Sequence, residues 1–230
     1  MGERRFVEDG IRQRCRCDGR TLLVSRELEV TTGANALACG SASVSLDLRT
    51  PHILCTVKSE VITTSSADQG ELSLSLTISE ARNPLIKRYE KELSSALDTL
   101  LLAHINRNQL LILPGHRAWR LNLEVTILDL DCGNLLDHAS LAIHAALTDV
   151  KLPNVRGFLN ANSEEVTLEV QDGDWALSLA DLPLLFTAWK IAGELVADVT
   201  GKEQALAQGC LQVSVAPSGL ICGVWKDSKD

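Results

Sequence analysis

The stretch LDLDCGNLLDHASLAIHAAL, residues 128–147, predicts a strand end, a sharp turn and a helix in direct succession. Gly133 permits the backbone to reverse within the turn. Asp137 is the expected N-cap, because its carboxylate can accept a hydrogen bond from a free helical N–H. Such a turn commonly holds a phosphate at the helix N-terminus. Here, however, the glycine is followed by residues that carry no charge: Asn134, Leu135 and Leu136.

The sequence before this stretch predicts strands and one long helix. Apolar and polar residues alternate with a period of two over residues 41–61, which indicates a β-hairpin, and again over 71–78. The period changes after Pro84, and one apolar stripe predicts a helix that ends near His104. A short strand at residues 110–113 and a long strand through residues 121–127 then lead back to the turn.

The second half predicts short strands. Residues 151–162 contain Pro153 and Gly157, and we interpret them as a loop that forms a boundary between halves. Five strand candidates follow, at residues 165–171, 184–189, 195–199, 210–215 and, as a closing hairpin, 219–225. The halves are strand-rich with helices between, so the predicted class is α+β, with mixed sheets packed on helices.

Charge is unevenly distributed along the 230 residues. The whole chain carries −8, which argues against a free-standing nucleic-acid binder, and no apolar run indicates a signal peptide. An intracellular location is the default expectation. Residues 1–26, by contrast, hold seven arginines against four acids, a local charge of +3. This basic arm is either solvated, with scattered ion pairs, or lies on an acidic partner or near RNA phosphates.

The residues suited to metal binding do not form a recognisable motif. Seven cysteines fit no zinc spacing and are expected to be reduced and structural. His138 and His144 are six apart and do not share one helical face. Asp129 and Asp131 point the same way from a strand, but no third ligand is near in sequence. The sequence therefore predicts no metal, no cofactor and no active site of its own.

Six segments in the same order and spacing resemble the RNase PH family. They include RCRCDGR (14–20), similar to an R-x-D-G-R motif, the hairpin of residues 40–61, the Pro84–His104 helix and residues 182–225. The similarity covers nearly the whole chain and is strongest to exosome ring subunits of the ribosomal RNA-processing protein 42 type, which carry G-N-[LI]-[LIF]-D after the central strand. The resemblance implies an RNase PH-like fold with two pseudo-repeated halves.

The resemblance also implies that this chain is a non-catalytic member. Catalytic relatives hold phosphate on a Gly-Thr-Arg-Ser-like run, but Gly133, Asn134, Leu135 and Leu136 stand here as a degenerate phosphate turn. Catalytic relatives also carry D-x-x-x-x-E-D. This chain retains Asp198, but Gln204 replaces the last aspartate, and an amide cannot titrate. Candidate RNA-binding residues are Lys87 and Arg88 (or Arg88 and Tyr89), with Arg117, Arg120 and His116 as weaker candidates.

Family membership implies partners and a domain plan. The partners would be other RNase PH-like subunits in a hexameric ring, S1/KH-type cap subunits and RNA in the channel, in the nucleus, the nucleolus and the cytoplasm, with no membrane. Residues 1–26 would form the arm and opening motif, and residues 27–230 the domain, without the usual long C-terminal helix. Two alternatives remain open: residues Lys87, Arg88 and Asp198 contribute to a composite phosphorolytic site with a partner, or the fold serves a small-molecule enzyme.

Overall fold

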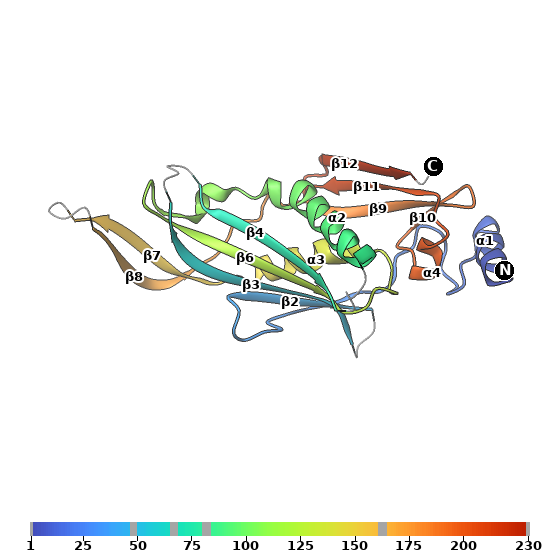
Figure 1. The fold of residues 1–230 in the computed structure, drawn as a ribbon, viewed down its shortest axis with the longest axis horizontal. Helices are drawn as coiled ribbons and strands as arrows, with labels where there is room; N and C mark the ends of the chain where they lie inside the picture. The colour runs from blue at the N-terminus through green and yellow to red at the C-terminus, as the bar shows by residue number, and fades with distance from the viewer. Residues whose placement is uncertain (1, 47–49, 65–68, 80–83, 161–164, 229–230) are drawn as a thin grey trace.

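A computed structural model describes residues 2–46, 50–64, 69–79, 84–160 and 165–228. The molecule is elongated: helix α3 lies between two sheets, and a two-stranded ribbon projects from one end (Figure 1). Asp47, Leu48 and Asn83, at the edges of predicted elements, lie outside the described residues, as do residues 161 and 162 of the predicted loop.

The larger sheet has six strands in the order β1-β2-β3-β6-β4, and β5 pairs with β6. The predicted hairpin is confirmed, because β2 and β3 pair antiparallel with Ala42 opposite Cys55. Only the β4–β6 pair is parallel among the described strands, so this sheet is mixed. The strands are β1 (Glu29–Thr32), β2 (Gly40–Ser45), β3 (Pro51–Thr63), β4 (Glu71–Ile78), β5 (Leu111–Leu113) and β6 (Arg117–Ile127).

The second sheet is antiparallel throughout, in the order β10-β9-β11-β12. Ala192 and Gly193 connect β9 to β10, and both have a positive φ. A two-residue hairpin turn with this backbone conformation matches the right-handed twist of the two strands it joins. The four predicted strands of this sheet are thereby confirmed. Their bounds are β9 (Leu184–Ile191), β10 (Glu194–Ala197), β11 (Gly209–Val215) and β12 (Ile221–Ser228).

The prediction of a loop at residues 151–162 was wrong. Residues Leu152–Leu159 form strand β7, which pairs antiparallel with β8 (Val166–Trp175) in the projecting ribbon. A two-stranded ribbon has only edge strands, and an edge strand tolerates Pro153 near its start. A side chain at Gly157 would press against Leu113, so this glycine allows close packing rather than a chain break.

Two long helices build the main core. Helix α2 (Pro84–Leu100) buries one stripe of leucines against the larger sheet, and η1 (Leu102–His104) continues it to the predicted end. Helix α3 (Leu135–Thr148) contacts β2 and β3 on one side and β9 on the other. Being covered by both sheets, it buries residues around most of its circumference. A short η2 (Arg107–Leu110) precedes β5.

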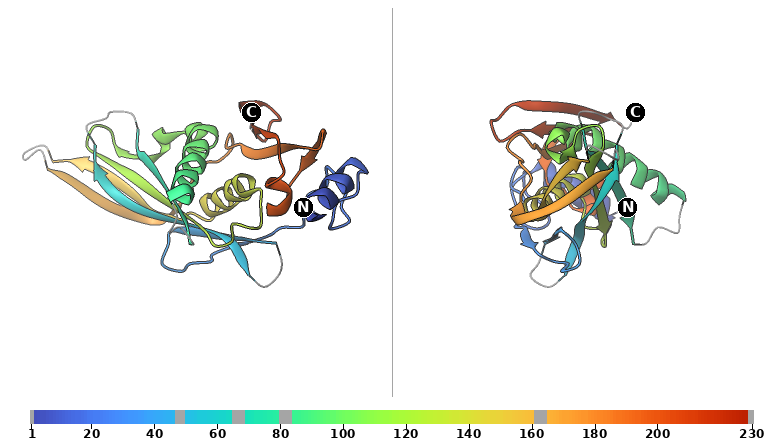
Figure 2. Two further views of the ribbon diagram at one scale, coloured as in Figure 1. Left: turned by 45° about the vertical axis from the view of Figure 1, so that its right-hand side comes forward. Right: turned by 90° about the vertical axis from the view of Figure 1, so that its left-hand side faces the viewer.

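The N-terminal residues pack against the C-terminal half. Figure 2 shows α1 (Gly2–Arg12) beside α4 (Gly201–Gln204), at the end of the molecule opposite the ribbon. Val7, Ile11 and Leu22 form a second apolar cluster with residues of the second sheet and the α4 segment: Ile191, Val196, Val199 and Ala207. No described helix is both long and apolar enough to cross a membrane.

Candidate functional site

The turn before α3 is bent by two successive residues in the left-handed region. Gly133 has a φ of 70° and Asn134 a φ of 51°. The bend brings the start of α3 against the segment before α4, where Gly201 N donates to Asp131 O at 3.1 Å. A side chain at Gly133 would collide with the backbone of residues 199–201. Two segments about seventy residues apart therefore meet with no room between them.

The prediction that Asp137 caps α3 was wrong. The N-cap position is Asn134, and Asp137 lies inside the first turn of the helix. Its carboxylate instead accepts hydrogen bonds from Thr187 N at 2.8 Å and Thr187 Oγ1 at 2.6 Å, and so ties α3 to β9. Burial raises the pKa of Asp137, although these hydrogen bonds oppose the rise.

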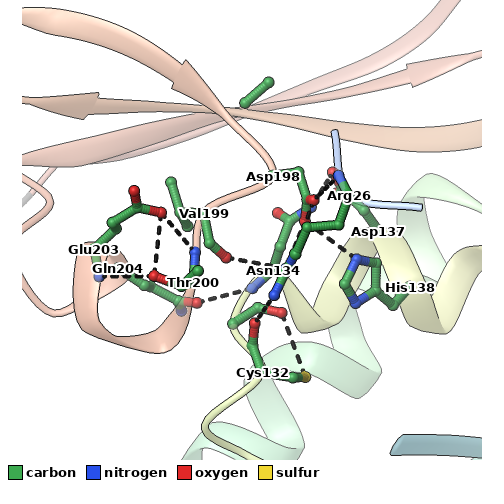
Figure 3. A network of polar contacts seen from close by, with 12 residues as sticks. Arg26, Cys132, Asn134, Asp137, His138, Asp198, Val199, Thr200, Glu203 and Gln204 are labelled. Atoms are coloured by element: carbon green, nitrogen blue, oxygen red, sulfur yellow. Dashed lines mark hydrogen bonds and ion pairs between the residues drawn. The ribbon is translucent and has the colours of Figure 1, made fainter. Parts of the chain in front are cut away.

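The polar groups of the turn bind other parts of the same chain. The side-chain oxygen of Gln204 accepts a hydrogen bond from Asn134 N at 3.0 Å (Figure 3). Trp189 Nε1 donates to Asn134 Oδ1 at 3.2 Å. Leu135 and Leu136, the next two residues, are 3% and 4% exposed and belong to the core. A backbone N–H that could hold an anion at this helix end is thus used internally.

Asp198 is buried and surrounded by cations (Figure 3). Arg26 binds both of its carboxylate oxygens, at 2.6 and 2.9 Å, and Arg20 binds one at 3.1 Å. Burial alone would raise the pKa of Asp198, but the hydrogen bonds from Arg26 and His138 hold it well below its usual range. Arg26 also donates to Cys132 O at 2.6 Å, which links Asp198 to the turn.

Arg16 and Glu203 form a buried ion pair next to Asp198. Arg16 Nε lies 2.9 Å from Glu203 Oε1, and the two side chains are 0% and 4% exposed. The guanidinium also donates to the carbonyl oxygens of Ala197 and Asp198. Burial would raise the pKa of Glu203, yet the hydrogen bonds with Arg16 and Thr200 lower it. Sequence reasoning missed this pair, although Arg16 lies within the motif quoted above.

The basic arm forms ion pairs, as one of the two sequence interpretations expected, but three of its arginines pair with residues far away in the sequence. Arg16, Arg20 and Arg26 face carboxylates of their own chain, Glu203 and Asp198. Arg4 and Arg12 form exposed pairs with Glu8 and Asp9 inside or just beside α1. The sequence offered one sign of these ion pairs. Several arginines cluster within residues 1–26, and two acidic residues, Asp198 and Glu203, lie in a short segment of the second half.

The four predicted RNA-binding residues do not gather in one place. Arg88 lines a cavity of about 650 Å³ between α2 and the turn before α3, together with Tyr89, Trp189 and Trp225. It pairs with Glu92 at 2.8 Å, and Lys87 is exposed beside it.

Arg117 and Arg120 lie at the opposite end of the larger sheet. Arg120 sits opposite Glu71 at the start of β4, whereas α2 follows the far end of that strand. Its guanidinium binds Glu60 and Glu71, which neutralise it, and Arg117 binds Thr63 Oγ1. His116 is half-buried at the turn that precedes β6.

Side chains that could bind a metal ion lie in two parts of the structure. Asp129 and Asp131 form a local turn, in which Asp129 Oδ1 accepts from Asp131 N at 2.8 Å. Among the described residues, one group brings three possible ligands together: His52, Cys132 and His138. Burial lowers the pKa of His52 to about 4 and raises the pKa of Cys132 to about 12, so both groups are neutral at pH 7. The seven cysteines, all of them described, form no disulfide.

A comparison with protein-family models identifies the family of this chain. Residues 25–153 match the RNase PH family, described as 3′ exoribonuclease family, domain 1. The chain belongs to this family, and the predicted RNase PH-like α+β fold is confirmed.

Its relatives are exosome components. The chain is 30% identical over 241 residues to exosome complex component Rrp42 of Methanothermobacter thermautotrophicus, covering 97% of this chain and 83% of that protein. It is 26% identical over 284 residues to the putative exosome complex exonuclease RRP42 of Dictyostelium discoideum, covering 98% and 86%. A chain of the Archaeoglobus fulgidus exosome with RNA bound to the active site shares the fold, with a TM-score of 0.78 at 23% identity over 99% of this chain and 87% of that one.

Proposed function

We propose that this chain is a non-catalytic structural subunit of an RNA exosome ring. It would pair with a catalytic-type RNase PH-like subunit, shape the RNA channel of a hexameric ring that S1/KH-type subunits cap, and so support 3′-to-5′ RNA processing and degradation, including that of rRNA. Two observations support the proposal. The relatives are exosome components, and in the turn before α3 the N–H of Asn134 binds Gln204 while the two residues that follow it are leucines. The expected locations are the nucleus, the nucleolus and the cytoplasm.

The observation that carries the proposal is the closed turn before α3. Phosphate at a helix N-terminus needs free N–H groups and compensating positive charge. Here the N–H of Asn134 binds Gln204, and the two leucines that follow it are buried in the core. Asp198, the retained first aspartate of the family pattern, is held by Arg20 and Arg26. Opening the turn for phosphate would break these internal contacts.

Native mass spectrometry of complexes purified through a tag on this chain tests the assembly. We expect one copy together with other RNase PH-like chains. The isolated chain, incubated with RNA and inorganic phosphate, is expected to release no nucleoside diphosphate. Recovery only as a lone monomer or as a self-oligomer would refute the ring proposal. Phosphate-dependent shortening of RNA by the isolated chain would instead refute the non-catalytic assignment.

A second candidate function is a contribution to a composite phosphorolytic site. The specific observation in its favour is the position of Arg88 at the 650 Å³ cavity beside the turn, with Lys87 exposed next to it. The double variant Lys87→Ala/Arg88→Ala in the purified complex distinguishes the candidates. A composite site predicts a large loss of phosphate-dependent degradation with the ring intact, and a scaffold predicts none. Arg4→Ala/Arg5→Ala, on exposed α1, is the matched control.

A further inference from the structure

Three possible metal ligands meet in the interior, from segments that are distant in sequence. His52 lies at the start of β3, Cys132 in the turn before α3, and His138 in the first turns of that helix. They are 3%, 6% and 2% exposed. One ligand atom of each lies within 4.8 Å of the other two. The sequence does not indicate this group, because its members are up to 86 residues apart.

The histidines have more hydrogen-bonding capacity than their surroundings satisfy. His52 Nε2 and His138 Nδ1 lie 3.0 Å apart. His52 Nδ1 is buried and has no hydrogen-bond partner among the described residues, and the contact of the buried His138 Nε2 is with Asp198 Oδ1, 3.3 Å away. Buried polar atoms without partners are rare and costly in folded proteins. The contact between the two rings holds one proton and is a single N–H···N hydrogen bond, which leaves His52 Nδ1 unsatisfied.

An ion between the three side chains would bind the two nitrogens that face each other, His52 Nε2 and His138 Nδ1. With His52 Nε2 and His138 Nδ1 as ligands, the proton of each neutral ring moves to the outer nitrogen. His138 Nε2–H then faces Asp198 Oδ1, 3.3 Å away (Figure 3). A carboxylate that accepts from the outer N–H of a ligating histidine is the usual support of a metal site. In a tetrahedral zinc site neighbouring ligand nitrogens lie about 3.4 Å apart, so the rings need to separate by only a few tenths of an ångström.

We propose that His52, Cys132 and His138 bind one Zn²⁺, supported by Asp198. One thiolate and two imidazoles suit zinc, whereas Mg²⁺ and Ca²⁺ prefer oxygen ligands. Cys132 Sγ now lies 3.2 Å from Asp129 O as a thiol donor; on binding it loses its proton to solvent and becomes a thiolate ligand. A water molecule takes the fourth position of the tetrahedron.

Such an ion would be structural. It would fasten the start of β3 to the degenerate turn and to the first turns of α3, and through Asp198 it would also hold the segment between β10 and α4. These are the segments that close the helix N-terminus against phosphate. The zinc site therefore stabilises the closed turn, and it is independent of whether the chain joins a ring.

Metal analysis of the purified full-length chain, followed by Co²⁺ substitution, tests the proposal. We expect about one zinc per chain after dialysis. With Co²⁺ in its place we expect the near-ultraviolet absorption of a cobalt–thiolate bond, and a rise in Tm on metal addition. Cys132→Ser is expected to abolish the cobalt–thiolate absorption, and His52→Gln and His138→Gln to weaken binding by at least tenfold.

Matched controls separate the site from other cysteines and histidines. Cys55→Ala removes another buried thiol on the same strand as His52, and His144→Gln changes a half-buried histidine on the same helix as His138. Both are expected to keep the absorption, as is Cys15→Ser/Cys17→Ser, which removes the exposed pair. A folded wild-type chain without stoichiometric zinc or cobalt–thiolate absorption would overturn the proposal. Absorption that persists in Cys132→Ser, or copper retained in place of zinc, would do the same.

Discussion

The turn before α3 and the segment before α4 meet at one place, yet they satisfy their polar groups in different ways. Residues 133–136 of the turn are uncharged, and the backbone donor Asn134 N binds a single neutral amide, that of Gln204. The segment before α4 instead carries two buried carboxylates, Asp198 and Glu203, each bound by arginines from the first 26 residues. The difference shows that neutral groups hold the turn, whereas ion pairs join residues 16–26 to residues 198–203.

The largest loss of unfolding free energy is expected from breaking the buried ion pair between Arg16 and Glu203. Arg16→Ala leaves Glu203 buried without its cation, which costs about 3–5 kcal/mol of unfolding free energy. Urea unfolding of the purified chain, followed by circular dichroism, measures the loss. Arg4→Ala removes an exposed pair with Glu8 and is expected to cost less than about 1 kcal/mol. Equal losses in the two variants would contradict the assigned role of the buried pair.

Acid is expected to weaken the same pair. The pKa of Glu203 is lower in the folded chain than its ordinary value of 4.5. Its contribution to stability is therefore complete above that value and is lost as the pH falls through the folded pKa. Unfolding free energies measured from about pH 6 to about pH 3 should fall more steeply for the wild type than for Glu203→Gln, which cannot titrate. Parallel curves would mean that Glu203 is not held by Arg16 in solution.

A smaller loss of unfolding free energy is expected from removing the neutral hydrogen bond between Asn134 N and the Gln204 side chain. Gln204→Ala leaves the buried N–H of Asn134 without its acceptor, at a cost of about 1–3 kcal/mol. Gln208→Ala, at an exposed position on the same segment, is expected to change the unfolding free energy by less than about 0.5 kcal/mol. If the two variants are equally stable, the turn is held by its leucines rather than by this amide.

The sequence predicted the parts of the fold that depend on local periodicity. Alternation placed the β2–β3 hairpin and β4, and the leucine stripe placed α2, because each pattern repeats within a few residues. It failed at β7, where Pro153 and Gly157 suggested a loop, since neither residue shows that its strand lies at an edge or packs closely on Leu113.

The candidate site could be predicted only in part, for a similar reason. The uncharged turn was visible in four consecutive residues. The contacts that close it were not, because Gln204 is 70 residues from Asn134, and Arg16 is 187 residues from Glu203. Asp137 shows the same limit: its spacing suits an N-cap, but Thr187, fifty residues later, offers it two donors. Tertiary hydrogen bonds here override local preference.

The smallest loss of unfolding free energy is expected at Thr200, which caps α4. This short helix carries both Glu203, of the ion pair, and Gln204, of the neutral hydrogen bond. Thr200 Oγ1 accepts from Glu203 N at 3.4 Å, and Thr200 N donates to the Glu203 carboxylate at 2.8 Å. Thr200→Ala removes the hydroxyl, which accepts from Glu203 N and also donates to Glu203 Oε2 at 3.1 Å, and we expect a loss of about 1 kcal/mol in unfolding free energy. Thr200→Ser keeps the hydroxyl and should remain near the wild type. The backbone N–H still orients Glu203 toward Arg16 in both variants, so a loss as large as that of Arg16→Ala would show that the cap, and not the arginine, positions the carboxylate.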